Sequence, residues 1–136
     1  MQPSERRIVL VAEDDPAQQE ILEEVLTFEG YRVLLANSPE QVVAQLSHAP
    51  DAVLMDVVGV MSPGVLASLL AMRRRPGIVL VSGESALAQT AARVGAERFL
   101  RKPYDLDELL RVLAELSGRI PSKALEDAPP LLLCTS

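Results

Sequence analysis

Short, uninterrupted apolar segments alternate along the chain with longer segments in which apolar residues recur at helical spacing. The short segments end at glycines, prolines or acidic residues, and such runs of about four to eight residues are typical of strands buried on both faces. The pattern predicts five strands, at Ile8–Ala12, Tyr31–Ala36, Ala52–Asp56, Ile78–Val81 and Arg98–Arg101. Five alternations of strand and helix predict an α/β fold with a parallel sheet.

Every predicted strand is followed by a helical segment with an apolar stripe that should face the sheet. The residues expected to face inward are Ile21, Leu22, Val25 and Leu26; Val42, Val43 and Leu46; Val65, Leu66, Leu69, Leu70 and Met72; Leu87, Ala91 and Val94; and Leu106, Leu109, Leu110, Leu113 and Leu116. Asp15-Pro16 and Ser38-Pro39 are typical helix starts, because an N-cap acceptor precedes a proline. Asp105 is expected to cap the last helix.

Charge distinguishes the central strands from the edge strands. Only the second and fifth strands carry arginines, so we expect them at the edges of a doubly wound sheet with strand order 2-1-3-4-5. Residues 8–118 are predicted to form one domain, between a polar lead at 1–7 and a flexible, proline-rich tail at 119–136.

Composition excludes several classes of function. A net charge of −6 argues against a general nucleic-acid surface. The run Arg73-Arg74-Arg75 is instead expected in the last turn of a helix, where cations complement the helix dipole. No apolar segment approaches the roughly 20 residues of a membrane span, and the single cysteine, Cys134, allows no internal disulfide. We expect a soluble, cytoplasmic protein.

Chemically related groups stand at the carboxyl ends of four strands. Glu13 and Asp14 follow the first strand, Asp56 ends the third, Ser82 follows the fourth and Lys102 follows the fifth. The predicted order makes the first and third strands neighbours, so the three acids share the crevice where such sheets bind ligands. Clustered carboxylates favour a cation, and Mg²⁺ or Mn²⁺ prefers oxygen ligands. With the hydroxyl and the lysine, this set could hold a phosphoryl group.

These residues, with the segments APDAVLMD, GYRVLLA and RFLRKPYDLDELL, resemble the receiver domain of two-component response regulators from about Ile8 to Leu116. The resemblance implies a flavodoxin-like, CheY-like (βα)5 fold and a phosphorelay signalling domain rather than an enzyme, with at most weak autophosphatase activity. Asp56 would accept a phosphoryl group from a histidine kinase or a histidine phosphotransfer protein. Asp14, Asp56 and the backbone carbonyl of Val58 would bind Mg²⁺, with Glu13 acting through water.

The resemblance also implies a switch. Ser82 and Lys102 would contact the phosphoryl group, the Lys102–Pro103 peptide bond would be cis, and Phe99 would turn inward. If Phe99 cannot turn, it would only fill the core. An unidentified downstream protein would bind the face built by the fourth helix (around Leu87–Val94), the fifth strand and the fifth helix.

The chain departs from the family directly after Asp56. Where the family pattern is D-x-x-M-P-x-x-D-G, this sequence has Gly59 in place of the methionine and Val60 in place of the proline, and only Gly64 matches. We therefore expect a flexible loop at 57–63. Val58 places an apolar side chain where water would approach an acyl phosphate, which predicts slow self-dephosphorylation.

Two other functions remain open from the sequence alone. The altered loop would suit a pseudo-receiver that binds partners without being phosphorylated. A small phosphatase with an aspartyl nucleophile could use a related sheet, but such enzymes carry a D-x-D motif after the first strand, where this chain has Glu13-Asp14.

Overall fold

The computed structural model describes residues 6–83 and 95–118. Residues 1–5 of the predicted lead at 1–7, the fourth helix around Leu87–Val94 and the tail at 119–136 therefore lie outside the described residues. Five parallel strands form one sheet in the order β2-β1-β3-β4-β5, which confirms the predicted order. The strands are β1 (Ile8–Ala12), β2 (Arg32–Ala36), β3 (Ala52–Asp56), β4 (Gly77–Ser82) and β5 (Arg98–Arg101). The described helices are α1 (Pro16–Phe28), α2 (Pro39–Leu46), α3 (Val57–Val60), α4 (Pro63–Ala71) and α6 (Leu106–Ser117).

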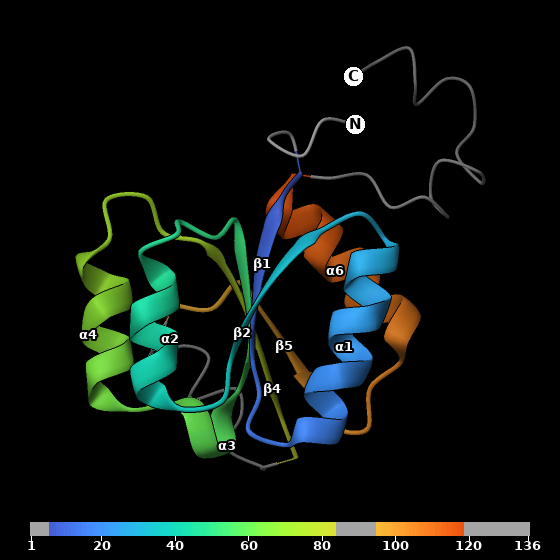
Figure 1. The fold of residues 1–136 in the computed structure, drawn as a ribbon, viewed down its shortest axis with the longest axis horizontal. Coiled ribbons are helices and arrows are strands. Elements are labelled where there is room, and N and C mark those ends of the chain that lie inside the picture. Colours follow the sequence, from blue (N-terminus) through green and yellow to red (C-terminus); the bar gives the residue numbers. More distant parts are fainter. Residues whose placement is uncertain (1–5, 84–94, 119–136) are drawn as a thin grey trace.

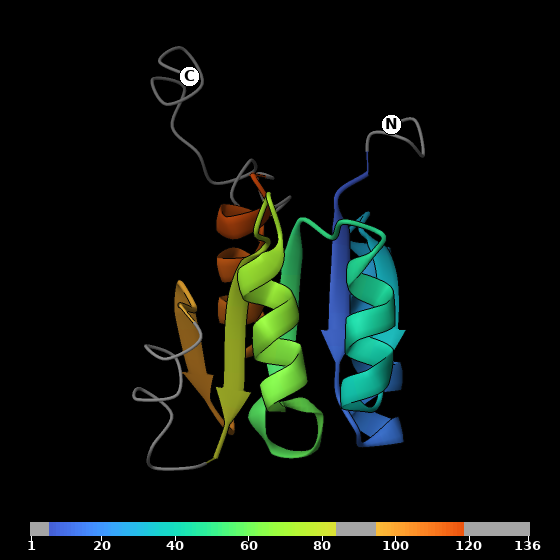
Figure 2. The same ribbon diagram turned by 90° about the vertical axis from the view of Figure 1, so that its left-hand side faces the viewer.

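Helices cover both faces of the sheet. Figures 1 and 2 show α1 and α6 on one face and α2 and α4 side by side on the other. Alternate residues of each central strand enter the two halves of the core: Leu10 and Met55 pack toward α2 and α4, whereas Val11 and Leu54 pack toward α1 and α6. This two-sided burial explains why the central strands read as continuous apolar runs.

The helix starts follow the predicted chemistry. Asp15 and Ser38 cap α1 and α2 and are each followed by proline, and Asp105 caps α6. Ser62, followed by Pro63, caps α4 in the same way. Because a capped start fixes the direction in which the chain leaves the sheet edge, these residues also shape the loops around the strand ends.

Two expectations for the segment between β3 and β4 are wrong. Residues 57–60 form the short helix α3, where a flexible loop was expected. The run Arg73–Arg75 lies beyond the last turn of α4, because Met72 already has extended backbone angles and ends the helix. Met72 therefore does not continue the helical stripe, and the arginines stand in an exposed loop.

Four apolar side chains that were expected to face the sheet are exposed instead. Adjacent positions on a helix differ by about 100°, so a flat sheet covers only one of two neighbouring apolar residues. Three of the four adjoin a buried residue in this way, and the fourth begins its helix. They are Ile21 (51% exposed), Val43 (40%), Leu70 (59%) and Leu106 (37%).

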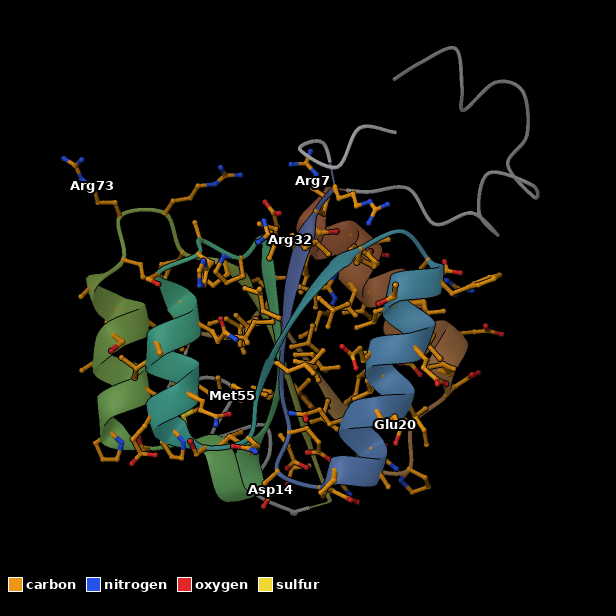
Figure 3. The ribbon with its side chains drawn as sticks, viewed as in Figure 1. Arg7, Asp14, Glu20, Arg32, Met55 and Arg73 are labelled. Atoms are coloured by element: carbon orange, nitrogen blue, oxygen red, sulfur yellow. The ribbon has the colours of Figure 1, made fainter. Side chains whose placement is uncertain are left out.

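The first and the last described residues, 6 and 118, lie at the same end of the sheet. The Arg7 guanidinium lies beside Gly118, with Nη2 3.9 Å from the position that a Cβ would occupy there. Figure 3 shows Arg7, Arg32 and Arg73 at this end and Asp14 at the opposite end. Within residues 6–83 and 95–118, the helices are all too short or too polar to cross a lipid bilayer.

Candidate functional site

Strand register brings the predicted site residues to one edge of the sheet. Ala12 pairs with Met55, so Glu13 lies level with Asp56, and Asp56 itself pairs with Val81. On the other side, Ser82 pairs with Arg101, so that Lys102 follows immediately, and the Lys102 amide donates to the Ser82 carbonyl at 3.0 Å. Residues from β3, from β4 and from the turns after β1 and β5 are thereby gathered at one place.

Lys102 joins the two buried carboxylates of this group. Its Nζ donates to Asp56 Oδ2 at 2.5 Å and lies 3.7 Å from Glu13 Oε1. Burial alone would lower the pKa of Lys102, but the hydrogen bond and the charge of Asp56 outweigh it and the pKa is raised. Lys102 is therefore a fixed positive charge, and it offsets only part of the negative charge around it.

Glu13 is the least satisfied carboxylate of the group. It is buried, and its Oε2 is a buried oxygen without a hydrogen-bond partner among the described residues. Burial and then the neighbouring Asp56 raise the pKa of Glu13 from 4.5 to about 7, while Lys102 acts in the opposite direction. A further positive charge beside Glu13 would satisfy this oxygen.

Asp14 completes an acidic cluster from the exposed side. Glu13, Asp14 and Asp56 can each offer an oxygen within 4.8 Å of the others. The Asp14 carboxylate lies against Gly59 of α3, and Gly59 has a φ of +98°. A Cβ at Gly59 would overlap the Asp14 carboxylate, so the glycine that replaces the family's methionine makes room for Asp14.

The donor set suits a hard divalent cation. Three carboxylates, one with a buried oxygen lacking a partner, provide the oxygen ligands that Mg²⁺ prefers. The cluster is also open on one side, which suits an ion that keeps several waters. The observed acidic site therefore fits Mg²⁺ by its chemistry.

The cluster opens into a cleft of about 360 Å³ that is lined by Glu13, Asp14, Asp15, Asp56, Ser82, Gly83 and Lys102. Since a water molecule takes about 30 Å³ in the liquid, this volume has room for a phosphoryl group together with a hydrated ion. Ser82 lines the same cleft and is 1% exposed, so this residue belongs to the floor of the site rather than to a surface turn.

Two further residues shape the site, and the sequence pattern did not single them out. Gln19 donates from Nε2 to the carbonyls of Glu13 and Ala36, both at 3.2 Å, which ties α1 to the turn after β1. Tyr104 borders a small cavity of about 10 Å³ beneath the carboxylates, and burial raises its pKa despite the nearby Lys102. Tyr104 follows the recognisable Lys102-Pro103 pair, which is the one signal that could have pointed to it.

The remaining predicted residues have different positions. The Lys102–Pro103 peptide bond is cis. Phe99 lies on β5 and is 49% exposed. Val58 belongs to α3, but its side chain lies outside the described part, so the predicted shielding of an acyl phosphate remains a prediction.

Comparison with known sequences gives a consistent result. A profile of the family described as response regulator receiver domain matches residues 9–114. The transcriptional regulatory protein TcrA of Mycobacterium tuberculosis is 34% identical over 118 residues, covering 83% of this chain and 47% of TcrA. The transcriptional regulatory protein CpxR of Klebsiella pneumoniae is 32% identical over 105 residues, covering 75% of this chain and 45% of CpxR. The chain thus spans about half the length of these curated relatives.

Solved structures include a similar domain with a bound ion. The receiver domain of sensor histidine kinase PA1611 from Pseudomonas aeruginosa PAO1 is 28% identical, with a TM-score of 0.71. The alignment covers 83% of this chain and 98% of that domain, whose crystal structure has a magnesium ion coordinated in the active-site cleft.

Proposed function

The chain belongs to the response regulator receiver domain family, and on this basis we propose that Asp56 is its phosphoacceptor. The observation that carries the proposal is the position of Asp56. It is buried at the end of a central strand, between Glu13 and Lys102 and at the base of an open cleft. An incoming phosphoryl group can therefore reach the Asp56 carboxylate only from the cleft side.

In the proposed reaction, an Asp56 carboxylate oxygen attacks the phosphorus of a phosphohistidine or a small phosphodonor. A phosphorus–oxygen bond to Asp56 forms and the bond from phosphorus to the donor breaks. The histidine of a protein donor then carries a proton on the released nitrogen, whereas acetyl phosphate releases acetate. Lys102 moves from Asp56 Oδ2 to the oxygens of the transferred group, where its charge offsets the new negative charge. Ser82 donates its hydroxyl to one of these oxygens.

We assign the cation site to Asp14 and Asp56, with the Val58 carbonyl as a third protein ligand and Glu13 acting through water. The acidic cluster and the unpartnered Glu13 oxygen support this assignment. A bound Mg²⁺ supplies positive charge to the phosphoryl oxygens during transfer. The magnesium ion in the similar Pseudomonas domain favours the same use here.

The phosphodonor is a histidine kinase or a histidine phosphotransfer protein, as for a member of this family. A donor must reach Asp56 through the cleft, so it must bind the surface beside the cleft. An open groove of about 480 Å³ adjoins Lys102 and is lined by Gln18, Ile21, Leu22, Lys102, Pro103, Tyr104 and Leu106. Ile21→Glu should slow transfer from a phosphorylated kinase several-fold and leave the reaction with acetyl phosphate unchanged.

The receiver unit comprises residues 8–118 and transmits its state through protein contacts rather than through catalysis. The proposed output face includes β5 and α6, with the half-exposed Phe99 as a residue that turns inward after phosphorylation. The fourth helix of that face lies outside the described residues. The matched relatives are about twice as long as this chain.

Incubation with acetyl phosphate and Mg²⁺, followed by intact-mass measurement, tests the proposal. We expect the mass of one phosphoryl group to be gained, and the gain to disappear with Asp56→Asn or when Mg²⁺ is chelated. Asp15→Asn is a matched control, since asparagine caps a helix as well as aspartate does, and it should still be phosphorylated. No gain in the parent protein, or an equal gain in Asp56→Asn, would overturn the assignment.

Release of phosphate from the purified phosphoprotein then tests the predicted slow self-dephosphorylation. Rapid hydrolysis in the presence of Mg²⁺ would contradict the role given to Val58.

A further inference from the structure

The carbonyl of Glu13 lies at the point where the pairing of β1 with β2 ends. The Glu13 amide donates to the Ala36 carbonyl of β2 at 3.0 Å, which continues the pairing by one residue. In a parallel pair, the next bond would come from the amide two residues further along the neighbouring strand, at Ser38. Ser38 instead caps the start of α2, and the Glu13 carbonyl receives its hydrogen bond from a side chain.

Gln19 of α1 supplies this hydrogen bond. Its Nε2 donates to the carbonyls of Glu13 and Ala36, both at 3.2 Å. Because an amide nitrogen carries two hydrogens, both bonds can form at once. Gln19 lies one turn into the helix, since its own amide donates to the Asp15 carbonyl at 2.9 Å. Helical side chains lean toward the N-terminus of their helix, so α1 reaches back over the turn that leads into it.

The bonded carbonyl belongs to the peptide group that joins Glu13 to Asp14. Both residues belong to the acidic cluster with Asp56. The Glu13 side chain is held by its burial, whereas Asp14 is exposed. Rotation of the peptide group between them would therefore move the Asp14 carboxylate away from the cluster and leave the Glu13 side chain in place.

We propose that Gln19 is a positioning residue for the cation site. By fixing the Glu13–Asp14 peptide group, its side-chain amide holds the Asp14 carboxylate beside Asp56. The proposal rests on the proposed function, in which Asp14 and Asp56 bind Mg²⁺. Gln19 acts through the backbone rather than on the ion itself, and residues that orient metal ligands in this way commonly change metal affinity by about tenfold or more.

Gln45 offers a matched control. Its Nε2 also donates to a carbonyl of β2, that of Leu35, at 2.9 Å, and both glutamines are half-buried. Successive carbonyls of a strand point in opposite directions, so the Leu35 carbonyl faces the open edge of the sheet and not β1. Only Gln19 also holds the turn after β1. A purely structural role in anchoring a helix to β2 would make the two glutamines equivalent.

The metal-free protein gives the first test. Gln19→Met removes the amide at nearly constant side-chain length and adds no charge. We expect the NMR order parameter of the Asp14 amide to fall in Gln19→Met and to keep the parent value in Gln45→Met. Gln19→Lys, which retains hydrogen-bond donors, should restore the order of Asp14. Melting temperatures establish that each variant is folded.

Titration with Mg²⁺, followed by amide NMR shifts, gives the second test. The Kd should rise about tenfold in Gln19→Met and stay unchanged in Gln45→Met. With acetyl phosphate as donor, the Mg²⁺ concentration that gives half of the maximal phosphorylation rate should rise by the same factor. The rate at saturating Mg²⁺ should be unchanged, because Asp14 is then held by the ion.

The two tests separate this inference from the proposed function. A parent protein that binds no Mg²⁺ would overturn the proposed cation site, and the inference with it. If the parent binds Mg²⁺, an Asp14 order parameter or a Kd in Gln19→Met equal to that of the parent would overturn the inference alone. An equal effect of Gln45→Met would do the same, since it would assign both results to general anchoring of β2.

Discussion

Glu13 couples the acidic site to pH. Its pKa is raised from 4.5 to about 7 by burial and by Asp56, so between these values the folded protein holds a proton at Glu13 that the unfolded chain releases. Without a bound cation, this residue makes the free energy of unfolding fall as pH rises through that window.

Glu13→Gln should remove this dependence in metal-free protein. We expect the variant to lose less stability than the parent between pH 5 and 7, and to be the more stable of the two near pH 7. Urea unfolding at several pH values with a chelator present measures the difference. Identical pH profiles would show that Glu13 does not titrate in this range.

Gly59 is the second residue on which the site depends. With a φ of +98° and the Asp14 carboxylate above it, a side chain at this position meets both backbone strain and steric overlap. Gly59→Ala should cost about 1–3 kcal/mol of stability and weaken Mg²⁺ binding by displacing Asp14. Gly64→Ala is the control, since a Cβ at Gly64 would make only ordinary contact with Ser62, and it should leave Mg²⁺ affinity unchanged.

At this scale, the strand-end residues could be predicted and the Gly59–Asp14 contact could not. Once the strand order is known, register alone brings Glu13, Asp56 and Lys102 together. The contact at Gly59 depends on a backbone conformation that neighbouring residues do not specify. The sequence marked Gly59 as a departure from the family and left its consequence open.

At the scale of elements, the residue before one strand caps the start of its neighbour. Asp51 precedes β3, and its Oδ2 accepts the amide of Ile8, the first residue of β1, at 2.7 Å. Glu97 precedes β5, and its Oε2 accepts the amide of Ile78 near the start of β4 at 2.6 Å. These carboxylates satisfy amides at the end of the sheet opposite the cleft and help to fix the register that assembles the site.

Asp51→Ala should therefore destabilise the protein by about 1–3 kcal/mol, since it leaves the Ile8 amide without its acceptor. Asp51→Asn keeps an acceptor oxygen and should recover most of this loss. It would lose only the distant contacts of Oδ1 with Arg7 and Arg74, both at 3.9 Å. Chemical unfolding separates the two variants, and equal losses would assign the effect to charge instead.

Element starts were easier to predict than element ends. A cap and a proline are local signals, and α1, α2 and α6 begin where these signals indicated. The end of α4 at Ala71 and the helix α3 depend on how the chain returns to the sheet. The pattern likewise placed Val43 and Leu70 toward the sheet, whereas the sheet covers their neighbours Val42 and Leu69 and leaves both exposed.

At the scale of the whole molecule, the fold separates the acidic cleft from an arginine-bearing end. The alternation of apolar segments and the placement of charge on two strands were enough to predict this architecture, because parallel sheets leave few arrangements open. This separation of charge was not evident from the sequence, since Arg7, Arg32 and Arg73 are far apart in sequence and lie at the same end of the sheet only in the fold (Figure 3).

The adjacency of Arg7 and Gly118 makes the domain a candidate for circular permutation. A short linker from residue 118 to residue 6 would close the chain, and new ends could open between the exposed residues His48 and Ala49. We expect the permuted protein to fold and to accept a phosphoryl group on Asp56, as intact mass would show. Residues 6 and 118 both lie at the end of the sheet opposite the cleft, so a segment attached at either residue starts on the far side of the domain from Asp56.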